Sequence, residues 1–152
     1  MLFGCATTNE QRFVGICGVT DEQGNTTGLR YVYRTERGEE LSYPENPADS
    51  RKLLFFSHRF KAHLYEANVR FMRGGYTYHV FFRDNPPSTE PDTVTGPDAG
   101  VEVTARSGKR VALIECGERP ASYFDEIRRL SACDIRNPLG EKACAQDAPE
   151  VP

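Results

Sequence analysis

The sequence lacks several features that would point to common classes of function. It has no tryptophan, no C-x-x-C pair and only three histidines, His58, His63 and His79. The spacings of zinc ribbons and dithiol redox motifs are therefore missing. No run of about 18 apolar residues occurs, so no membrane-spanning helix is expected. With 19 Lys and Arg against 22 Asp and Glu, the net charge of −3 lacks the basic excess that is typical of nucleic-acid binders.

Motifs of catalysis are also missing. There is no G-x-S-x-G, and no cysteine lies beside a base in a recognisable context. Gly74-Gly75 is followed neither by a helix nor by a lysine at the spacing of a phosphate-binding loop. The carboxylate pairs Glu39-Glu40 and Asp125-Glu126 fall in a turn and on a helix surface, where solvated charge is the ordinary state. From the alternation of residues, we expect the histidines not to share a strand face with Glu66. We therefore expect no catalytic residue, no cofactor and no metal site, and a protein that is not an enzyme.

What the sequence does contain is a pattern of short strands. Seven Tyr and nine Phe, with ten Pro and thirteen Gly, favour an all-β domain with turn-rich connections. Two aromatic-rich runs flank Gly74-Gly75, and because paired glycines accept positive φ, this arrangement predicts a β-hairpin. We expect an antiparallel barrel or sandwich of about eight short strands. The expected strands are residues 12–19, 29–35, 40–43, 53–58, 64–72, 76–82, 101–105 and 110–116.

One short C-terminal helix follows, over residues 122–130. Ser122 is a candidate N-cap, and Phe124, Ile127 and Leu130 recur on one face. We expect a single β-rich domain over residues 12–135 that includes this helix. An N-terminal tether, residues 1–11, precedes the domain, and an irregular tail, residues 136–152, follows it.

Five cysteines without a metal motif indicate disulfides and an oxidising compartment. We expect Cys17, Cys116, Cys133 and Cys144 to form two bonds, for which three pairings exist. We prefer Cys17–Cys116, because these residues lie on the first and last strands of the sheet. Cys133–Cys144 would then hold the tail beneath the helix.

This pairing leaves Cys5 without a disulfide partner. Residues 2–5, L-F-G-C, match the end of a lipoprotein signal, in which the cysteine is acylated. A complete signal also needs a charged start and an apolar region of about 7–15 residues, and only four residues precede Cys5. The lipidation hypothesis therefore requires a longer start. The alternative is a soluble periplasmic protein in which the match at Cys5 is incidental.

Charged surface residues are the candidates for binding. The middle of the chain is rich in Lys and Arg, whereas residues 84–99 form a proline-rich acidic loop. A long loop on a rigid scaffold is a common way to present a binding site, and the alternative is a loop that is merely mobile. Tyr31, Tyr33, Tyr76 and Tyr78 either form a platform on a strand face or pack in the core. The binding candidates are Arg59, Arg70, Arg73, Glu90, Asp92 and Asp98.

Three segments carry a resemblance. They are F-F-S-H-R-F, N-V-R-F-M-R-G-G-Y-T-Y-H-V-F-F-R-D and G-V-E-V-T-A-R-S-G-K-R-V-A-L-I-E-C, with a closing L-S-A-C-D. Over residues 13–135 the chain resembles a family of small uncharacterised exported proteins of Gram-negative bacteria. The resemblance implies an exported β-rich domain and brings no activity with it. By analogy only, the chain is also similar to periplasmic lysozyme inhibitors and toxin-immunity proteins. The inhibitory loops of the membrane-bound lysozyme inhibitors are not found here.

These observations together predict a protein-binding module of the periplasm, or one anchored at the outer membrane and facing the periplasm. The expected partner is another protein, such as a secreted toxin or a cell-wall hydrolase, that the module inhibits or neutralises. Nucleic acid is not an expected partner, and contact with a membrane would come only through a lipid anchor. The alternatives are a small-ligand-binding β-barrel with aromatic side chains around its cavity and an accessory envelope lipoprotein.

Overall fold

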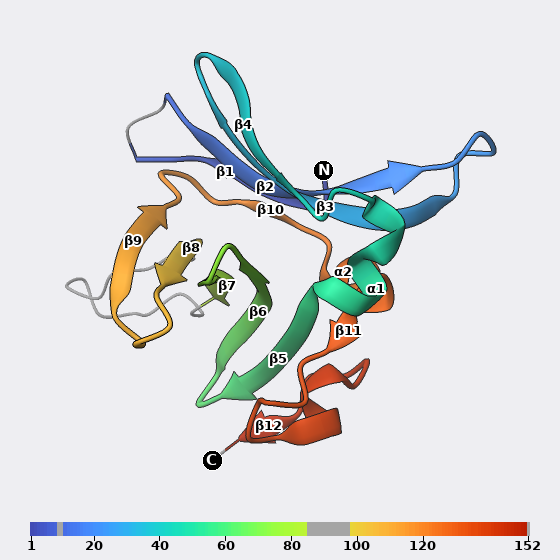
Figure 1. Cartoon of the computed structure of the whole chain (residues 1–152). Helices are drawn as coiled ribbons and strands as arrows, with labels where there is room; N and C mark the ends of the chain where they lie inside the picture. Colours follow the sequence, from blue (N-terminus) through green and yellow to red (C-terminus); the bar gives the residue numbers. More distant parts are fainter. Residues whose placement is uncertain (9–10, 85–97, 152) are drawn as a thin grey trace.

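Two β-sheets pack face to face as a sandwich in the computed structural model, which describes residues 1–8, 11–84 and 98–151 (Figure 1). The fold is all-β, as the sequence predicted, and it is an open sandwich rather than a closed barrel. The described residues form twelve strands, more than the eight expected, because four short strands near the chain ends had no periodic pattern to reveal them.

The five-stranded sheet contains the N-terminal third of the chain. Its strands lie in the order β10-β1-β2-β3-β4. They are β1 (Phe3–Ala6), β2 (Phe13–Thr20), β3 (Thr26–Thr35), β4 (Gly38–Tyr43) and β10 (Ala121–Ser122). Leu29 and Tyr31 of β3 are buried between the sheets, as the alternation of residues in this strand predicted.

The seven-stranded sheet has the order β11-β5-β6-β7-β8-β9, and β12 also pairs with β5. Its strands are β5 (Phe55–Lys61), β6 (Leu64–Arg73), β7 (Tyr76–Asp84), β8 (Asp98–Thr104), β9 (Arg110–Glu115), β11 (Ala132–Cys133) and β12 (Glu150–Val151). The β6–β7 hairpin is confirmed, with Gly74 and Gly75 in its turn at φ of 61° and 83°. The β8–β9 hairpin is confirmed too.

Short helices close one side of the sandwich (Figure 1). They are η1 (Pro47–Asp49), α1 (Ser50–Leu53), α2 (Phe124–Arg129) and η2 (Gly140–Cys144). Helix α2 is shorter than the predicted 122–130, because Ser122 belongs to β10 and Tyr123 takes the N-cap position without a side-chain bond. Ile127 and Leu130 are fully buried and join the helix to the core.

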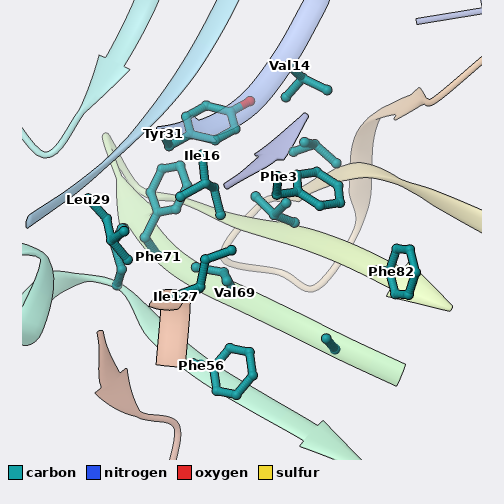
Figure 2. Close-up of a cluster of buried hydrophobic side chains, with 14 of the residues drawn as sticks. Phe3, Val14, Ile16, Leu29, Tyr31, Phe56, Val69, Phe71, Phe82 and Ile127 are labelled. Carbon is teal, nitrogen blue, oxygen red and sulfur yellow. The ribbon is translucent and has the colours of Figure 1, made fainter. Parts of the chain in front are cut away.

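Aromatic side chains pack together with aliphatic ones in the core between the sheets (Figure 2). The Tyr31 ring lies 5.0 Å from that of Phe71, and the rings of Phe71 and Tyr78 are stacked at 4.7 Å. Tyr31 and Tyr78 therefore pack inside the protein, and only Tyr76 of the four candidate tyrosines is strongly exposed. Burial of each large aromatic side chain stabilises the fold by about 1.5–3 kcal/mol.

The predicted N-terminal tether is wrong, because residues 3–6 form β1 inside the five-stranded sheet. Phe3 and Cys5 are each about 1% exposed and face the core. β1 can lie this close to β2 because residue 15 is a glycine. A Cβ added to Gly15 would lie 2.6 Å from the carbonyl oxygen of Phe3. The strand has only 4 residues, and one of its two partners, β10, comes from the far end of the domain, so local alternation did not reveal it.

The predicted Cys17–Cys116 bond is also wrong. Cys116 is joined to Cys5, and Cys17 is a free, half-buried thiol on β2. The two bonded cysteines meet because β1 runs beside the end of β9, where Thr7 and Cys116 form an isolated bridge. Since the Cys5 sulfur is bonded to Cys116 and the side chain is buried, acylation of this sulfur is incompatible with the structure.

The predicted Cys133–Cys144 bond is present, but the tail that it holds is more ordered than expected. β11 and β12 both pair in parallel with β5, and Ala143 is fully buried. The tail therefore adds strands to the seven-stranded sheet. Figure 1 shows these last segments, in orange and red, alongside β5.

Candidate functional site

The outer face of the seven-stranded sheet gathers three of the predicted binding residues. Residues alternate between the two faces of a strand, and on β6 the core-facing positions include Val69 and Phe71. The positions of β6 that alternate with these, including Arg70, consequently lie on the outer face. Arg59 of β5 and Asp98 of β8 occupy the same face, because they belong to one cross-strand row with Glu66 and Arg83.

That row is a ladder of ion pairs. Arg59 Nε donates to Glu66 Oε2 at 2.8 Å, and Arg83 Nη1 donates to Asp98 Oδ2 at 2.9 Å. A longer contact of 3.8 Å links Arg83 to Glu66. These groups are partly exposed, so each pair contributes at most about 1 kcal/mol. Arg59 and Asp98 are thus brought together and largely neutralise their neighbours.

Arg70 is in a different state, because it is buried. Its Nε donates to Asp134 Oδ2 at 2.9 Å and its Nη2 donates to Asp134 Oδ1 at 3.1 Å. Arg70 is 8% and Asp134 6% exposed, and the guanidinium lies 4.7 Å from the centre of the Phe55 ring. Bidentate pairing of this kind offsets the free-energy cost of removing both charges from water. The pair joins β6 to the segment after β11.

A hollow of about 430 Å³ opens above this pair. We call it the outer hollow. Its floor contains Ser57, Asn68, Arg70 and His79, and the exposed side chains of Arg106 and Arg136 lie on its rim. Asn68 Oδ1 is buried there and has no hydrogen-bond partner within the described part of the protein. An unpaired buried acceptor costs about 1–3 kcal/mol, and because this oxygen is buried, it is not open to the hollow.

His79 lies beside Arg70, as its cross-strand partner on β7. Burial lowers the pKa of His79, and the positive charge of Arg70 lowers it further, while Glu102 and Asp134 act in the opposite direction. The imidazole is accordingly neutral at pH 7, and it can both donate and accept a hydrogen bond in the outer hollow.

Positive charge concentrates at one end of this face. The β6–β7 and β8–β9 turns lie next to each other, since Thr77 pairs with Thr104. No carboxylate of the described residues forms an ion pair with the exposed cations there. We call this set the basic end: Arg106, Lys109, Arg110 and Arg136. The sequence singled out none of these four; it singled out Arg73, which ends β6 at the neighbouring turn but lies, by alternation from Phe71, on the other face of the sheet, beside Tyr43. The R-S-G-K turn was visible, but its position beside Gly74-Gly75 depends on the sheet order.

Apolar side chains lie exposed around the same face. Ile135, next to buried Asp134, is 68% exposed, and Leu113, opposite Glu102 on the edge strand β9, is 38% exposed. Exposed apolar groups beside charged ones are typical of protein-binding surfaces. Two further candidates, Glu90 and Asp92, lie outside the described residues.

The remaining histidines lie elsewhere. His58 is buried on β5, where its Nε2 donates to the carbonyl of Ala145 and its Nδ1 accepts from the Tyr65 hydroxyl at 2.9 Å. His63 is exposed in the β5–β6 turn at φ 69°. Within the described ranges, no group of three or more His, Cys, Asp or Glu side chains is placed to hold a metal ion. Those ranges contain no helix with the length and apolarity needed to cross a membrane.

The two disulfides are typical of a non-reducing compartment, such as the periplasm or the exterior of the cell. Comparison with known proteins gave no match to a protein-family model, to a curated protein or to a solved structure.

Proposed function

We propose that this protein is a periplasmic binding module that engages another protein through the outer face of the seven-stranded sheet. Its role is recognition rather than catalysis. The two disulfides support an exported protein. Because the Cys5 sulfur is bonded to Cys116, the proposal places the protein free in the periplasm rather than held by an acyl chain on Cys5.

The observation that carries the proposal is the composition of the outer face. A hollow lined by polar groups, the exposed cations of the basic end, which pair with no carboxylate of the described residues, and exposed apolar side chains all lie on one sheet. Protein interfaces combine these elements, with arginine and apolar side chains supplying much of the binding energy. The protein is acidic overall, so the basic end is a local reversal of its charge and favours a partner with an acidic contact surface.

The partner that we propose is a toxin or a cell-wall hydrolase that acts in the envelope, which the module inhibits or neutralises. Charge complementarity accelerates association and excludes like-charged competitors, and both effects suit an inhibitor. A scaffold that is cross-linked by two disulfides loses little conformational entropy when its surface binds a partner.

The aromatic side chains that a ligand-binding barrel would place around a cavity instead pack against one another, as the stacked rings of Phe71 and Tyr78 do. This packing favours recognition at the surface over binding between the sheets.

Site-specific photo-crosslinking in periplasm tests the proposal. A benzoylphenylalanine at Ile135 or Leu113 should form an adduct with one protein, identified by mass spectrometry, and the purified pair should bind each other. The control is the same probe at Thr27, an exposed residue of the five-stranded sheet, where no adduct is expected. Adducts at Thr27 alone, or a captured protein that fails to bind when purified, would contradict the proposal.

A further inference from the structure

Two hairpin turns form one exposed surface at the end of the seven-stranded sheet. The β6–β7 and β8–β9 turns are neighbours, because Thr77 pairs with Thr104. They also touch, since a Cβ added to Gly75 would lie 3.4 Å from Arg106 Nε. Every residue of segments 72–76 and 106–111 is exposed, and we call these two segments together the hairpin tips. A flat partner that approaches this end of the sheet meets both turns at once.

The hairpin tips are strongly cationic. Their positive side chains are Arg73, Arg106, Lys109 and Arg110, and they contain neither Asp nor Glu. No carboxylate in the described part of the chain forms an ion pair with any of these side chains, although Glu45 lines a hollow beside Arg73. Because the whole chain has a net charge of −3, a polyanionic surface is attracted to this end of the molecule in particular.

Large apolar side chains stand among these cations. Met72 is 49%, Tyr76 45% and Val111 51% exposed. A soluble anion such as phosphate would leave all three in water. The boundary between the headgroups and the acyl chains of a bilayer accommodates both kinds of side chain, because apolar and tyrosine side chains enter it while Lys and Arg meet the lipid phosphates.

We propose that the hairpin tips dock on the surface of a bilayer that contains anionic phospholipid. The cations contact the headgroup phosphates, and Met72, Tyr76 and Val111 enter the level of the headgroups. This contact needs no acyl chain on the protein, in agreement with the bond between Cys5 and Cys116. The proposal goes beyond the proposed function and does not depend on it. An acidic protein could also pair with the cations, but the exposed apolar side chains favour lipid.

A single fluorophore tests which end of the protein enters the bilayer. The chain has no tryptophan, so Tyr76→Trp places the only one at the hairpin tips. We expect its emission to shift to the blue on vesicles of equal parts phosphatidylglycerol and phosphatidylcholine at low ionic strength, and to be quenched by lipids brominated on their acyl chains. The control is Tyr123→Trp. Tyr123 is 61% exposed and precedes Phe124, whose ring packs on Tyr65 and Phe82 at the opposite end of β6 and β7, so little change is expected there.

Vesicle sedimentation tests the contribution of the cations. Each Lys or Arg near an anionic surface contributes a factor of about five in affinity, so Lys109→Gln combined with Arg110→Gln should weaken binding about tenfold or more. Arg51→Gln combined with Lys52→Gln removes the same charge from exposed residues of α1 and should change binding by at most about twofold. All four side chains are exposed, so both double variants are expected to fold.

Several results would overturn the proposal. They are the absence of binding at low ionic strength, binding to pure phosphatidylcholine that is as tight as binding to the mixed vesicles, and equal losses in the two double variants. Quenching of the control probe that equals quenching at position 76, or binding without a blue shift at that position, would show that the hairpin tips do not enter the bilayer. Polyglutamate that binds as tightly as the mixed vesicles would identify an acidic polypeptide as the occupant instead. The vesicles contain no protein, so failure here is distinct from failure of the crosslinking experiment.

Discussion

Arg70 on β6 and Asp134 in the tail, 64 residues apart in sequence, form a buried ion pair joined by two hydrogen bonds of 2.9 and 3.1 Å. The pair fixes the tail against the sheet and forms the floor of the outer hollow.

Loss of one partner of this pair should cost much more stability than loss of both. Asp134→Ala leaves a buried, unpaired guanidinium, so we expect the free energy of unfolding to fall by about 3–5 kcal/mol. Arg70→Met combined with Asp134→Leu removes both charges and should recover most of that loss. Urea unfolding measures both values.

The matched control is Asp84→Ala, which removes the partner of Arg119 in an exposed pair of 3.5 Å. We expect a change of at most about 1 kcal/mol there. Equal effects of Asp84→Ala and Asp134→Ala would show that burial does not distinguish the two pairs.

Stability should decrease as the pH falls from 7 to about 5. Burial lowers the pKa of His58, with Arg128 adding to the shift and the hydrogen bond to Ala145 and the charge of Asp125 opposing it. The pKa of His79 is lowered as well. A histidine with a lower pKa in the folded state takes up its proton first in the unfolded state, so acid favours unfolding below about pH 6.5.

Urea unfolding at several pH values tests this dependence. His58→Gln with His79→Gln should flatten the slope of stability against pH between 7 and 5, whatever the effect on stability at pH 7. His63→Asn is the control, because asparagine tolerates the φ of 69° at this exposed turn. An unchanged slope in the double variant would refute the assignment to these two histidines.

The two disulfides should contribute unequally to the free energy of unfolding. Cys5–Cys116 spans 111 residues and Cys133–Cys144 spans 11, and in the chain-entropy model these bonds stabilise the fold by about 4.7 and about 3 kcal/mol. We expect paired Cys→Ala variants to lose stability in that order, and Cys17→Ser to lose less than about 1 kcal/mol. Peptide mapping without reduction should find a free thiol at Cys17, and a Cys17–Cys116 peptide would contradict the structure.

Amide hydrogen exchange distinguishes a strand at the N-terminus from a tether. The N–H of Leu2 donates to Ile16 and that of Thr7 donates to Arg12, so we expect both amides to exchange slowly. Gly15→Ala, which places a methyl group against the Phe3 carbonyl, should speed exchange in β1 and cost about 1–3 kcal/mol. Rapid exchange throughout residues 2–7 of the unaltered protein would favour the tether.

The sequence predicted those parts of the fold that depend on neighbouring residues. The β6–β7 hairpin follows from alternation on both sides of Gly74-Gly75, and the Cys133–Cys144 bond closes a short loop. Cys5 was misassigned because its partner, Cys116, is 111 residues away in sequence and is brought beside β1 by the bridge between Thr7 and Cys116.

The candidate site was only partly predictable for the same reason. Arg70 was recognised as a charged residue of a strand, but its partner Asp134 lies in a segment without periodicity. Arg106 and Arg136 meet at one hollow only because the β8–β9 turn and the tail reach the same edge of the sheet. Composition identifies such residues as charged, whereas sheet order decides which of them act together.

The most direct test of the central claim, that the outer face of the seven-stranded sheet is the binding surface, is the affinity for the partner identified by crosslinking. Isothermal titration calorimetry would compare the unaltered protein with Arg106→Glu combined with Arg136→Glu, and with Arg51→Glu as control. We predict binding at least about a hundredfold weaker in the double variant, about 2.7 kcal/mol, and nearly unchanged in the control. Unchanged affinity in the double variant, or an equal loss in the control, would contradict the account.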